Sequence, residues 1–404
     1  MPTVSSAIRD QAILSTNREK LDFSEEISLL DPNANPKTYI FQKLGSIGTG
    51  NIIHRWFEDE LQPETDQVNY GTGYSSSATS IVVDDGDKFA AGDLVMHNQT
   101  REVMLVTAVT TDTLTVDRDY GQGSTPGYTA RADTIDNNDY LTILSNAFEQ
   151  GHPLPAAKST VEVERYNVCQ DVRTPISITD IAANSAMHGA QDLPWQLKKA
   201  GITHTRKLER MNTWGVPDIG DKGAYVAATT NTHPATAGGI WWYMDAYASS
   251  SRKVSQAEIT QAEFMSWLEA AFEYGSSEKT LFCPPLLNSA FDSWGMSKGQ
   301  TFMGDTVMGM KIRRWESSHG LVNIVIDKML KEPSTDGSFA FLLDMENIKW
   351  AYFNKIGMTQ LNEIDMYKAG GYTRIDYEYR TISCIEFKQP ETHAVLKDMT
   401  SYAA

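Results

Sequence analysis

Two extended runs that lie about a hundred residues apart constrain the fold of this chain more than any other feature. Residues 52–62 partly alternate apolar and polar side chains, which is typical of a strand with one packed face. Residues 161–178 are rich in β-branched side chains and also read as extended. We therefore expect the two runs to form the legs of one long hairpin, and the residues between them to form an insertion.

The insertion, roughly residues 70–150, has the pattern of an all-β domain. Four short apolar runs separated by turn residues occupy positions 81–83, 93–96, 102–109 and 113–117. Strands spaced by about ten residues, with turn chemistry between them, predict a small barrel or sandwich.

Residues 192–214 have the strongest helical pattern in the chain. Asp192 is suited to cap the helix, Pro194 suits its first turn, and Gly215 followed by Pro217 is typical of a helix end. At a rise of ~1.5 Å per residue the helix is a rod of roughly 33 Å. Its outer face carries five basic side chains: Lys198, Lys199, Arg206, Lys207 and Arg210.

The remaining segments mix element types. Residues 216–371 combine helical patterns, one opened by a possible capping box at Thr260 and Glu263, with clustered strands. Residues 372–388 alternate and predict a final strand. Residues 1–51 have no long periodic pattern and contain prolines that interrupt regular structure, so we expect an arm that lies over another surface. The predicted fold class is α+β.

The charge balance limits the possible partners. The chain has 404 residues, enough for roughly two to three domains. Its formal charge is −17, from 52 acids and 35 bases, which argues against a net basic nucleic-acid binder. The excess of acidic residues is unevenly distributed along the chain. Residues 71–150 contain 12 acids and 4 bases, whereas residues 151–215 are net positive. We expect neither a membrane span nor a secretory signal, and we expect the three cysteines to be reduced structural thiols.

A search for catalytic signatures predicts no catalytic residue, no metal site and no cofactor. The phosphate-loop, zinc-protease, serine-hydrolase and thiol-redox motifs are all missing from the sequence. The acidic clusters at 84–87 and 133–139 lack the closing glutamate of a calcium loop and are expected to be solvated turns.

Three residue groups leave alternatives open. Glu58, Asp59 and Glu60 could supply a carboxylate pair for glycoside hydrolysis, since strand alternation would place Glu58 and Glu60 about 6.6 Å apart on one face. Trp241 and Trp242 fit a ligand pocket, core packing or a subunit contact. The basic face of the 192–214 helix fits nucleic acid or an acidic neighbour. A carbohydrate-binding or glycoside-hydrolase-like β-rich protein is therefore the alternative function.

Extended arms and hairpins cannot bury their own apolar side chains, which indicates an assembly protein. The sequence resembles the major capsid proteins of tailed bacteriophages, which have the HK97-like fold. The segments that carry this resemblance are 16–36, 55–63, 87–95, 101–109, 166–179 and 385–396. It spans almost the whole chain.

The resemblance implies five parts. Residues 1–51 would be the N-terminal arm, and residues 52–178 the extended E-loop with the β-rich insertion domain. Residues 179–215 would be the peripheral (P) domain with its long spine helix, residues 216–371 the axial (A) domain, and residues 372–404 the return to the P domain.

The resemblance also implies a structural protein and not an enzyme. Copies would assemble with one another into hexamers and pentamers of an icosahedral virion capsid, built in the host cytoplasm, around double-stranded DNA that is not bound sequence-specifically. Portal, scaffold or decoration proteins are further possible partners, and no membrane is involved. Expected assembly contacts are the five basic residues of the helix, together with Glu58, Asp59, Glu60, Trp241 and Trp242.

Overall fold

The computed structural model describes residues 36–121, 132–153, 155, 157–185, 192–219, 234–297, 304–307, 310–330, 337–354 and 360–403. It divides into two compact units, which are Met1–Trp56 with Glu164–Ala404, and Phe57–Val163. We call the first the main unit and the second the insertion unit. Part of the expected arm, residues 1–35, lies outside the described residues.

The two predicted hairpin legs pair with each other. Strand β2 (Ile53–Glu58) and strand β9 (Val163–Val168) form a two-stranded ribbon, and the division between the units falls within it. The second leg is shorter than predicted, because β10 (Gln170–Thr179) leaves the ribbon. β10 pairs antiparallel with β20 (Arg374–Phe387), a partner too distant in sequence for local pattern to indicate.

The insertion unit is a closed six-stranded barrel, one of the two β architectures that the turn spacing predicted. Its strand order is β3-β8-β5-β6-β7-β4, and a bridge between Val68 and Val83 joins the two outer strands. The apolar side chains that point inward, such as Val95, Met104 and Leu141, form its core. The strands are β3 (Thr65–Gln67), β4 (Ser80–Val82), β5 (Asp93–His97), β6 (Val103–Thr110), β7 (Thr113–Asp117) and β8 (Tyr140–Asn146).

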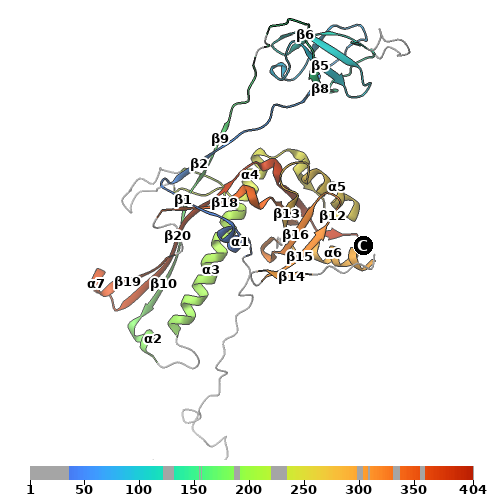
Figure 1. Cartoon of the computed structure of the whole chain (residues 1–404). Coiled ribbons are helices and arrows are strands. Elements are labelled where there is room, and N and C mark those ends of the chain that lie inside the picture. The colour runs from blue at the N-terminus through green and yellow to red at the C-terminus, as the bar shows by residue number, and fades with distance from the viewer. Residues whose placement is uncertain are drawn as a thin grey trace, which may run out of the picture. The chain divides into compact units, whose positions relative to one another are not determined.

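One sheet of the main unit supports the long helix. Helix α3 (Asp192–Trp214) occupies the predicted range and packs against β10 and β20 through Leu208 and Met211 (Figure 1). The sheet has the order β1-β18-β20-β10, and β19 also pairs with β20. The other elements are β1 (Ser46–Thr49), β18 (Ile348–Phe353), β19 (Gln360–Asp365), α1 (Pro36–Leu44), α2 (Asp180–Asn184) and α7 (Met366–Gly370).

A second sheet of seven strands has the order β11-β21-β17-β13-β16-β15-β14. Its strands are β11 (Lys253–Ser255), β13 (Glu278–Cys283), β14 (Gly304–Val307), β15 (Met310–Glu316), β16 (Leu321–Ile326), β17 (Ser338–Leu343) and β21 (Ala394–Met399). Strands β12 (Glu258–Ile259) and β22 (Ser401–Tyr402), which follow β11 and β21 in the sequence, form a separate two-stranded sheet.

The helices of this region are α4 (Ile240–Tyr247), α5 (Gln261–Ala271) and α6 (Pro285–Ser297). The predicted capping box is confirmed, since Thr260 and Glu263 each accept a backbone N–H of the other at the start of α5. Helix α6 continues past Gly295 and ends at Ser297. With both sheets and these helices, the α+β class is confirmed.

Sheet membership does not follow chain order. Strands β18 and β19, which lie within residues 216–371, belong to the five-stranded sheet with β20. Strand β21, which lies within residues 372–404, is instead an interior strand of the seven-stranded sheet. The C-terminal segment thus contributes to both sheets.

Gly215 ends α3 by allowing a close approach of two backbones. A Cβ there would lie 2.2 Å from the carbonyl oxygen of Ala237 and 2.6 Å from that of Met211. The Gly215 N–H donates to the Met211 carbonyl at 2.9 Å, and the Gly239 N–H donates to the Gly215 carbonyl at 2.8 Å. A side chain at Gly215 would therefore separate α3 from the segment that leads into α4.

Candidate assembly surfaces

The ribbon carries the predicted acidic cluster, but not as a carboxylate pair. β2 ends at Glu58, whose side chain is nearly buried, whereas Asp59 and Glu60 are exposed beyond the strand. Asp59 accepts the backbone N–H of Glu60 at 2.9 Å. Because the alternation stops at Glu58, the expected placement of Glu58 and Glu60 on one strand face is wrong.

Large apolar side chains are exposed on both legs where they enter the insertion unit. Phe57 is 69% exposed, Leu61 93% and Val161 79%. An isolated exposed apolar residue is ordinary, but several on two neighbouring legs mark a contact surface.

The legs are held against a turn of the barrel and enclose a hollow. Lys158 Nζ donates to the carbonyl oxygens of Asp87 and Phe89, and Gln62 donates to that of Lys88 at 2.8 Å. Beside these bonds is an open hollow of about 310 Å³, lined by residues 59–62 and 158–160. No aromatic ring lines it for a sugar to stack against, so the hollow does not favour the carbohydrate alternative.

The described residues contain no group of three His, Cys, Asp or Glu side chains arranged to hold a metal ion. Likewise, none of the described helices is long and apolar enough to cross a membrane.

The five basic residues of α3 divide into two groups. Lys198, Lys199 and Arg210 are exposed, and within the described part of the chain none of them forms an ion pair. Lys207 instead donates to the Arg173 carbonyl and to Thr174 Oγ1, both at 3.1 Å, and Arg206 is half-buried. Three cations are thus presented for an external contact.

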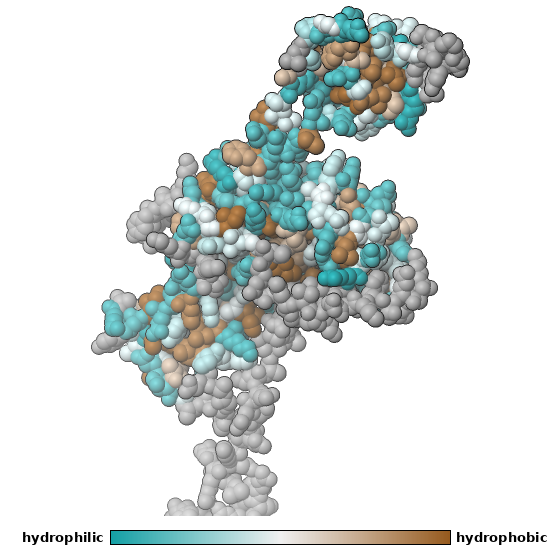
Figure 2. All heavy atoms as spheres, viewed as in Figure 1, coloured by the Kyte–Doolittle hydropathy of each residue, from teal (hydrophilic) through white to brown (hydrophobic). Residues whose placement is uncertain are grey.

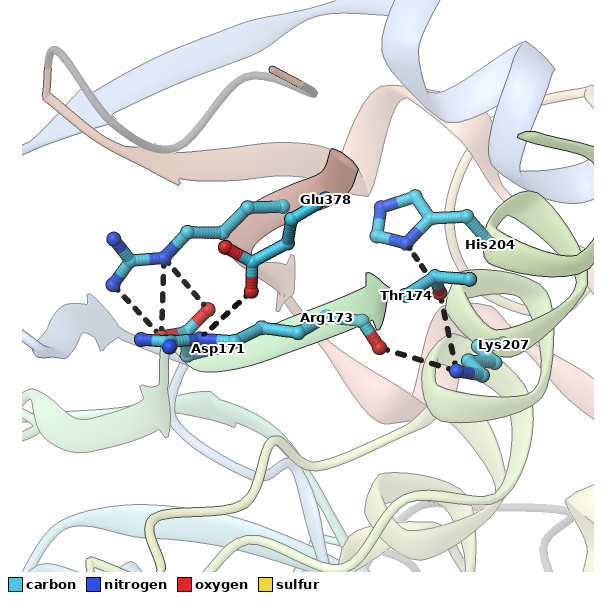
Figure 3. Close-up of polar contacts among 7 residues, drawn as sticks. Asp171, Arg173, Thr174, His204, Lys207 and Glu378 are labelled. Carbon is cyan, nitrogen blue, oxygen red and sulfur yellow. Dashed lines mark hydrogen bonds and ion pairs between the residues drawn. The ribbon is translucent and has the colours of Figure 1, made fainter. Parts of the chain in front are cut away.

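The inner face of α3 is attached to its sheet by a buried histidine. His204 hydrogen-bonds through Nδ1 to Thr174 Oγ1 at 3.1 Å (Figure 3). Its Nε2 hydrogen-bonds to Thr381 Oγ1 at 2.8 Å. Burial, and secondarily the charge of Lys207, lowers the pKa of His204, so the ring is neutral at neutral pH. The bonds join α3 to both β10 and β20.

The opposite side of the same strand pair carries a charged network. Asp171 accepts from Arg173 at 2.7 Å and from Arg380 at 2.8 Å, and Arg173 lies 3.6 Å from Glu378 (Figure 3). Burial alone would raise the pKa of Asp171, but the hydrogen bonds from Arg380 and Arg173 outweigh it and lower that pKa. These ion pairs reinforce the pairing of β10 with β20, the two strands on which α3 packs.

Trp241 and Trp242 pack within the chain. The Trp241 ring lies 5.4 Å from that of Phe339 and 6.5 Å from that of Trp214, and the Trp242 ring lies 4.9 Å from Tyr243. Both remain half-buried. Of the three roles left open for them, the structure shows aromatic packing around α4.

A buried ionic cluster anchors α1, and the sequence did not indicate it. Lys37 Nζ lies 2.5 Å from Asp327 Oδ2 and 3.6 Å from Glu209 Oε1, and all three side chains are buried. The Glu209 carboxylate also accepts the backbone N–H groups of Lys37 and Thr38, at 3.1 and 2.7 Å. It therefore caps the N-terminus of α1, where the helix dipole favours an anion.

Burial raises the pKa of Glu209, while Lys37 and the bonds from Thr38 act against that shift. The one local signal of this cluster is that Glu209 is an acid in a stretch of α3 that is otherwise basic. Lys37 and Thr38 lie 172 and 171 residues from Glu209 along the chain, so sequence pattern could not identify them as its partners.

We expect the stability of the main unit to fall below neutral pH because of His393. Its Nδ1 accepts the Asp344 N–H at 2.9 Å and its Nε2–H donates to the Lys388 carbonyl at 3.1 Å, which requires the neutral ring. Complete burial lowers the pKa of His393 to about 3, against an ordinary value of 6.5. The unfolded chain therefore binds the proton first, and stability is lost as the pH falls from 6.5 toward 3.

The loss attributable to His393 between pH 7 and pH 5 is about 2 kcal/mol. Urea unfolding of the wild type and of His393→Gln at both pH values measures it as the difference between the two proteins. Burial alone would raise the pKa of Glu386, but its bonds with His54 and Lys388 lower that pKa to about 2. The stability that Glu386 contributes is therefore lost only as the pH falls below 4.5. An equal pH dependence in both proteins would contradict the assignment.

Three comparisons place the chain among known proteins. A family model described as SU10 major capsid protein matches residues 9–400. The major capsid protein of Pseudomonas phage PaMx41 is 23% identical over 290 residues, which make up 69% of this chain and 66% of that protein. The match thus spans slightly less than two thirds of the relative's length.

Solved structures with a similar fold include Mycobacterium phage Bobi, with 8% identity, a TM-score of 0.46, and coverage of 96% of this chain and 97% of that one. The holo-SrpI encapsulin complex of Synechococcus elongatus PCC 7942 has 10% identity and a TM-score of 0.44, covering 61% of this chain and 80% of that one.

Proposed function

This chain belongs to the SU10 major capsid protein family, and we propose that its copies assemble as hexamers and pentamers into an icosahedral phage head that encloses packaged DNA. The family is structural, so the role is that of a building block and not of an enzyme. Assembly takes place in the host cytoplasm, and the DNA is enclosed without sequence-specific contacts. The glycoside-hydrolase alternative has no support from the comparisons.

The observation that carries this proposal is the exposed apolar surface of the ribbon legs. The exposed apolar side chains of the legs do not belong to the core of the insertion unit; they are Phe57, Leu61 and Val161. Burying a side chain of this size against a neighbour stabilises an assembly by about 1.5–3 kcal/mol. A chain that leaves several such side chains in water gains most when another copy covers them.

The parts of the chain have the following roles in the proposal. Residues before α1 are the arm, and the ribbon with the insertion unit is the E-loop. The five-stranded sheet with α3 is the P domain, and the seven-stranded sheet with α5 and α6 is the A domain. The C-terminal segment serves both, since β20 and β21 lie in different sheets.

Charge complementarity supports one contact between copies. The exposed ribbon acids Asp59 and Glu60 of one copy lie on the exposed cations of a neighbour's α3, which are Lys198, Lys199 and Arg210. Opposite charges across an interface guide association and set its register. Trp241 contributes by packing α4 against Trp214 at the end of α3, and Trp242 packs against Tyr243 and Tyr247 within α4.

Reversing the three α3 cations tests this contact. Lys198→Glu with Lys199→Glu and Arg210→Glu should prevent assembly, because like charges would then face each other. Negative-stain microscopy and size exclusion would show soluble capsomers or single chains in place of shells. Added salt should weaken assembly of the wild type, since exposed charges are screened over about 8–10 Å in ordinary buffers.

The matched control combines the triple reversal with Asp59→Lys and Glu60→Lys, which restores opposite charges. Recovery of shells supports the contact, and failure to recover them rejects this pairing of surfaces. A wild-type chain that remains a monomer under all assembly conditions would reject the capsid function itself.

A further inference from the structure

The barrel of the insertion unit has an apolar outer face. Along β5 the side chains of Val95 and His97 point into the core, so those of Leu94 and Met96 point outward. Leu94 lies opposite Leu105 of β6 in the strand register. We call the outward side of β5, β6 and β8 the outer face.

Strand β8 extends this face. Tyr140 is 50% exposed and Leu144 is 49% exposed, and β8 is hydrogen-bonded to β5. Figure 2 shows apolar atoms gathered on the insertion unit around these strands, which Figure 1 labels. None of Leu94, Met96, Leu105, Tyr140 and Leu144 belongs to the core of the barrel.

This arrangement reverses the ordinary pattern of an antiparallel sheet. Such sheets place polar side chains on the side that faces water. Here adjacent strands present mostly apolar ones, with Thr142 opposite Met96 as a polar member of the face. The strands on either side return to polar residues, with Gln67 opposite Tyr140 and Asp117 opposite Leu105. An apolar centre within a polar rim is the anatomy of a protein-binding surface.

The charge of the unit identifies the kind of partner. Residues 57–163 contain 18 acids and 5 bases. Two copies brought together through this face would bring two strongly acidic units into contact, which like-charge repulsion opposes. A surface with an apolar centre and basic residues around it would match both features.

We propose that the outer face binds a separate protein whose contact surface is apolar in the centre and basic at its rim. This goes beyond the proposed shell assembly, which uses the ribbon and α3. The outer face is then a second interaction surface, and assembly does not require it.

The test uses the full-length chain and a short helical peptide of leucine and lysine, with its leucines on one side and lysines beside them. We expect the peptide to bind the wild type, and to bind Leu105→Ser with Leu144→Ser about tenfold more weakly. Ile181→Ser, which removes an isoleucine of the main unit that is 82% exposed, is the matched control and should bind as the wild type does. Salt should weaken binding, because the rim contacts are ionic.

Four results would overturn the proposal. They are no binding by the wild type, equal binding by the double variant, equal binding of a peptide with serine in place of leucine, or self-association that the double variant abolishes and salt strengthens. The last would assign the face to a second copy. Leu144→Ser alone, at an exposed position, repeats the test should the double variant unfold.

Particle formation is measured separately by negative stain. Loss of peptide binding with shells intact supports the outer face as an independent surface. Failure of the wild type to form shells would count against the proposed function and would leave the peptide result standing.

Discussion

Replacing Lys37 by methionine should lower the free energy of unfolding of the main unit by about 3–5 kcal/mol. The substitution keeps the length and apolar stem of the side chain but removes its charge. Asp327 and Glu209 would remain buried as two acids without their cation. Breaking a buried ion pair from one side is costly because the remaining charge has lost both water and partner.

Urea unfolding followed by tryptophan fluorescence measures this change, since Trp56 and Trp350 lie in the same core cluster as Phe41 of α1. Lys368→Met is the matched control, because Lys368 is exposed and its pairing with Asp365 is worth at most about 1 kcal/mol. Deletion of residues 1–35 keeps Lys37 and should leave unfolding unchanged while preventing assembly. Equal losses from Lys37→Met and Lys368→Met would show that the cluster does not anchor α1.

Replacing Arg118 by methionine should unfold the barrel without unfolding the main unit. Arg118 forms two bonds with the fully buried Glu102, at 2.6 and 2.7 Å. It also donates to the carbonyl oxygens of Ser75, Ala78 and Asp133. Its loss leaves a buried charge and three acceptors without this donor, so we expect the barrel to lose about 3–5 kcal/mol.

Hydrogen exchange resolves this effect by position. Amides of β5 and β6 should lose protection in Arg118→Met, whereas amides of β13 and β16 should keep theirs. Arg101→Met removes an exposed arginine of the same unit and serves as the control. Loss of protection in both units together would contradict the division of the chain into two units.

Local patterns predicted much of the fold because their causes are local. The apolar stripe of α3, the Thr260–Glu263 capping box and the β6–β7 hairpin each depend on residues within a few positions of one another. The extended legs were also predictable, because the regular alternation of a strand appears within a single run.

The candidate site was only partly predictable. The sequence indicated which cations lie on the outer side of α3, since helical geometry decides that. It did not indicate that Lys207 bonds with β10, or that Trp241 and Trp242 pack against Phe339 and Tyr243. These contacts depend on which elements lie together in space.

By itself, the sequence determined the element types, the all-β insertion and the long helix, because short-range periodicity and turn chemistry encode them. Only the tertiary structure decided that β10 leaves the ribbon for β20, that β21 enters the seven-stranded sheet, and that Glu209 caps a helix 171 residues away. The physical reason is that strand partners and buried charges are selected by contacts distant in sequence. The free energy of these contacts depends on the residues that surround them in the folded chain. A single run of residues does not contain that information.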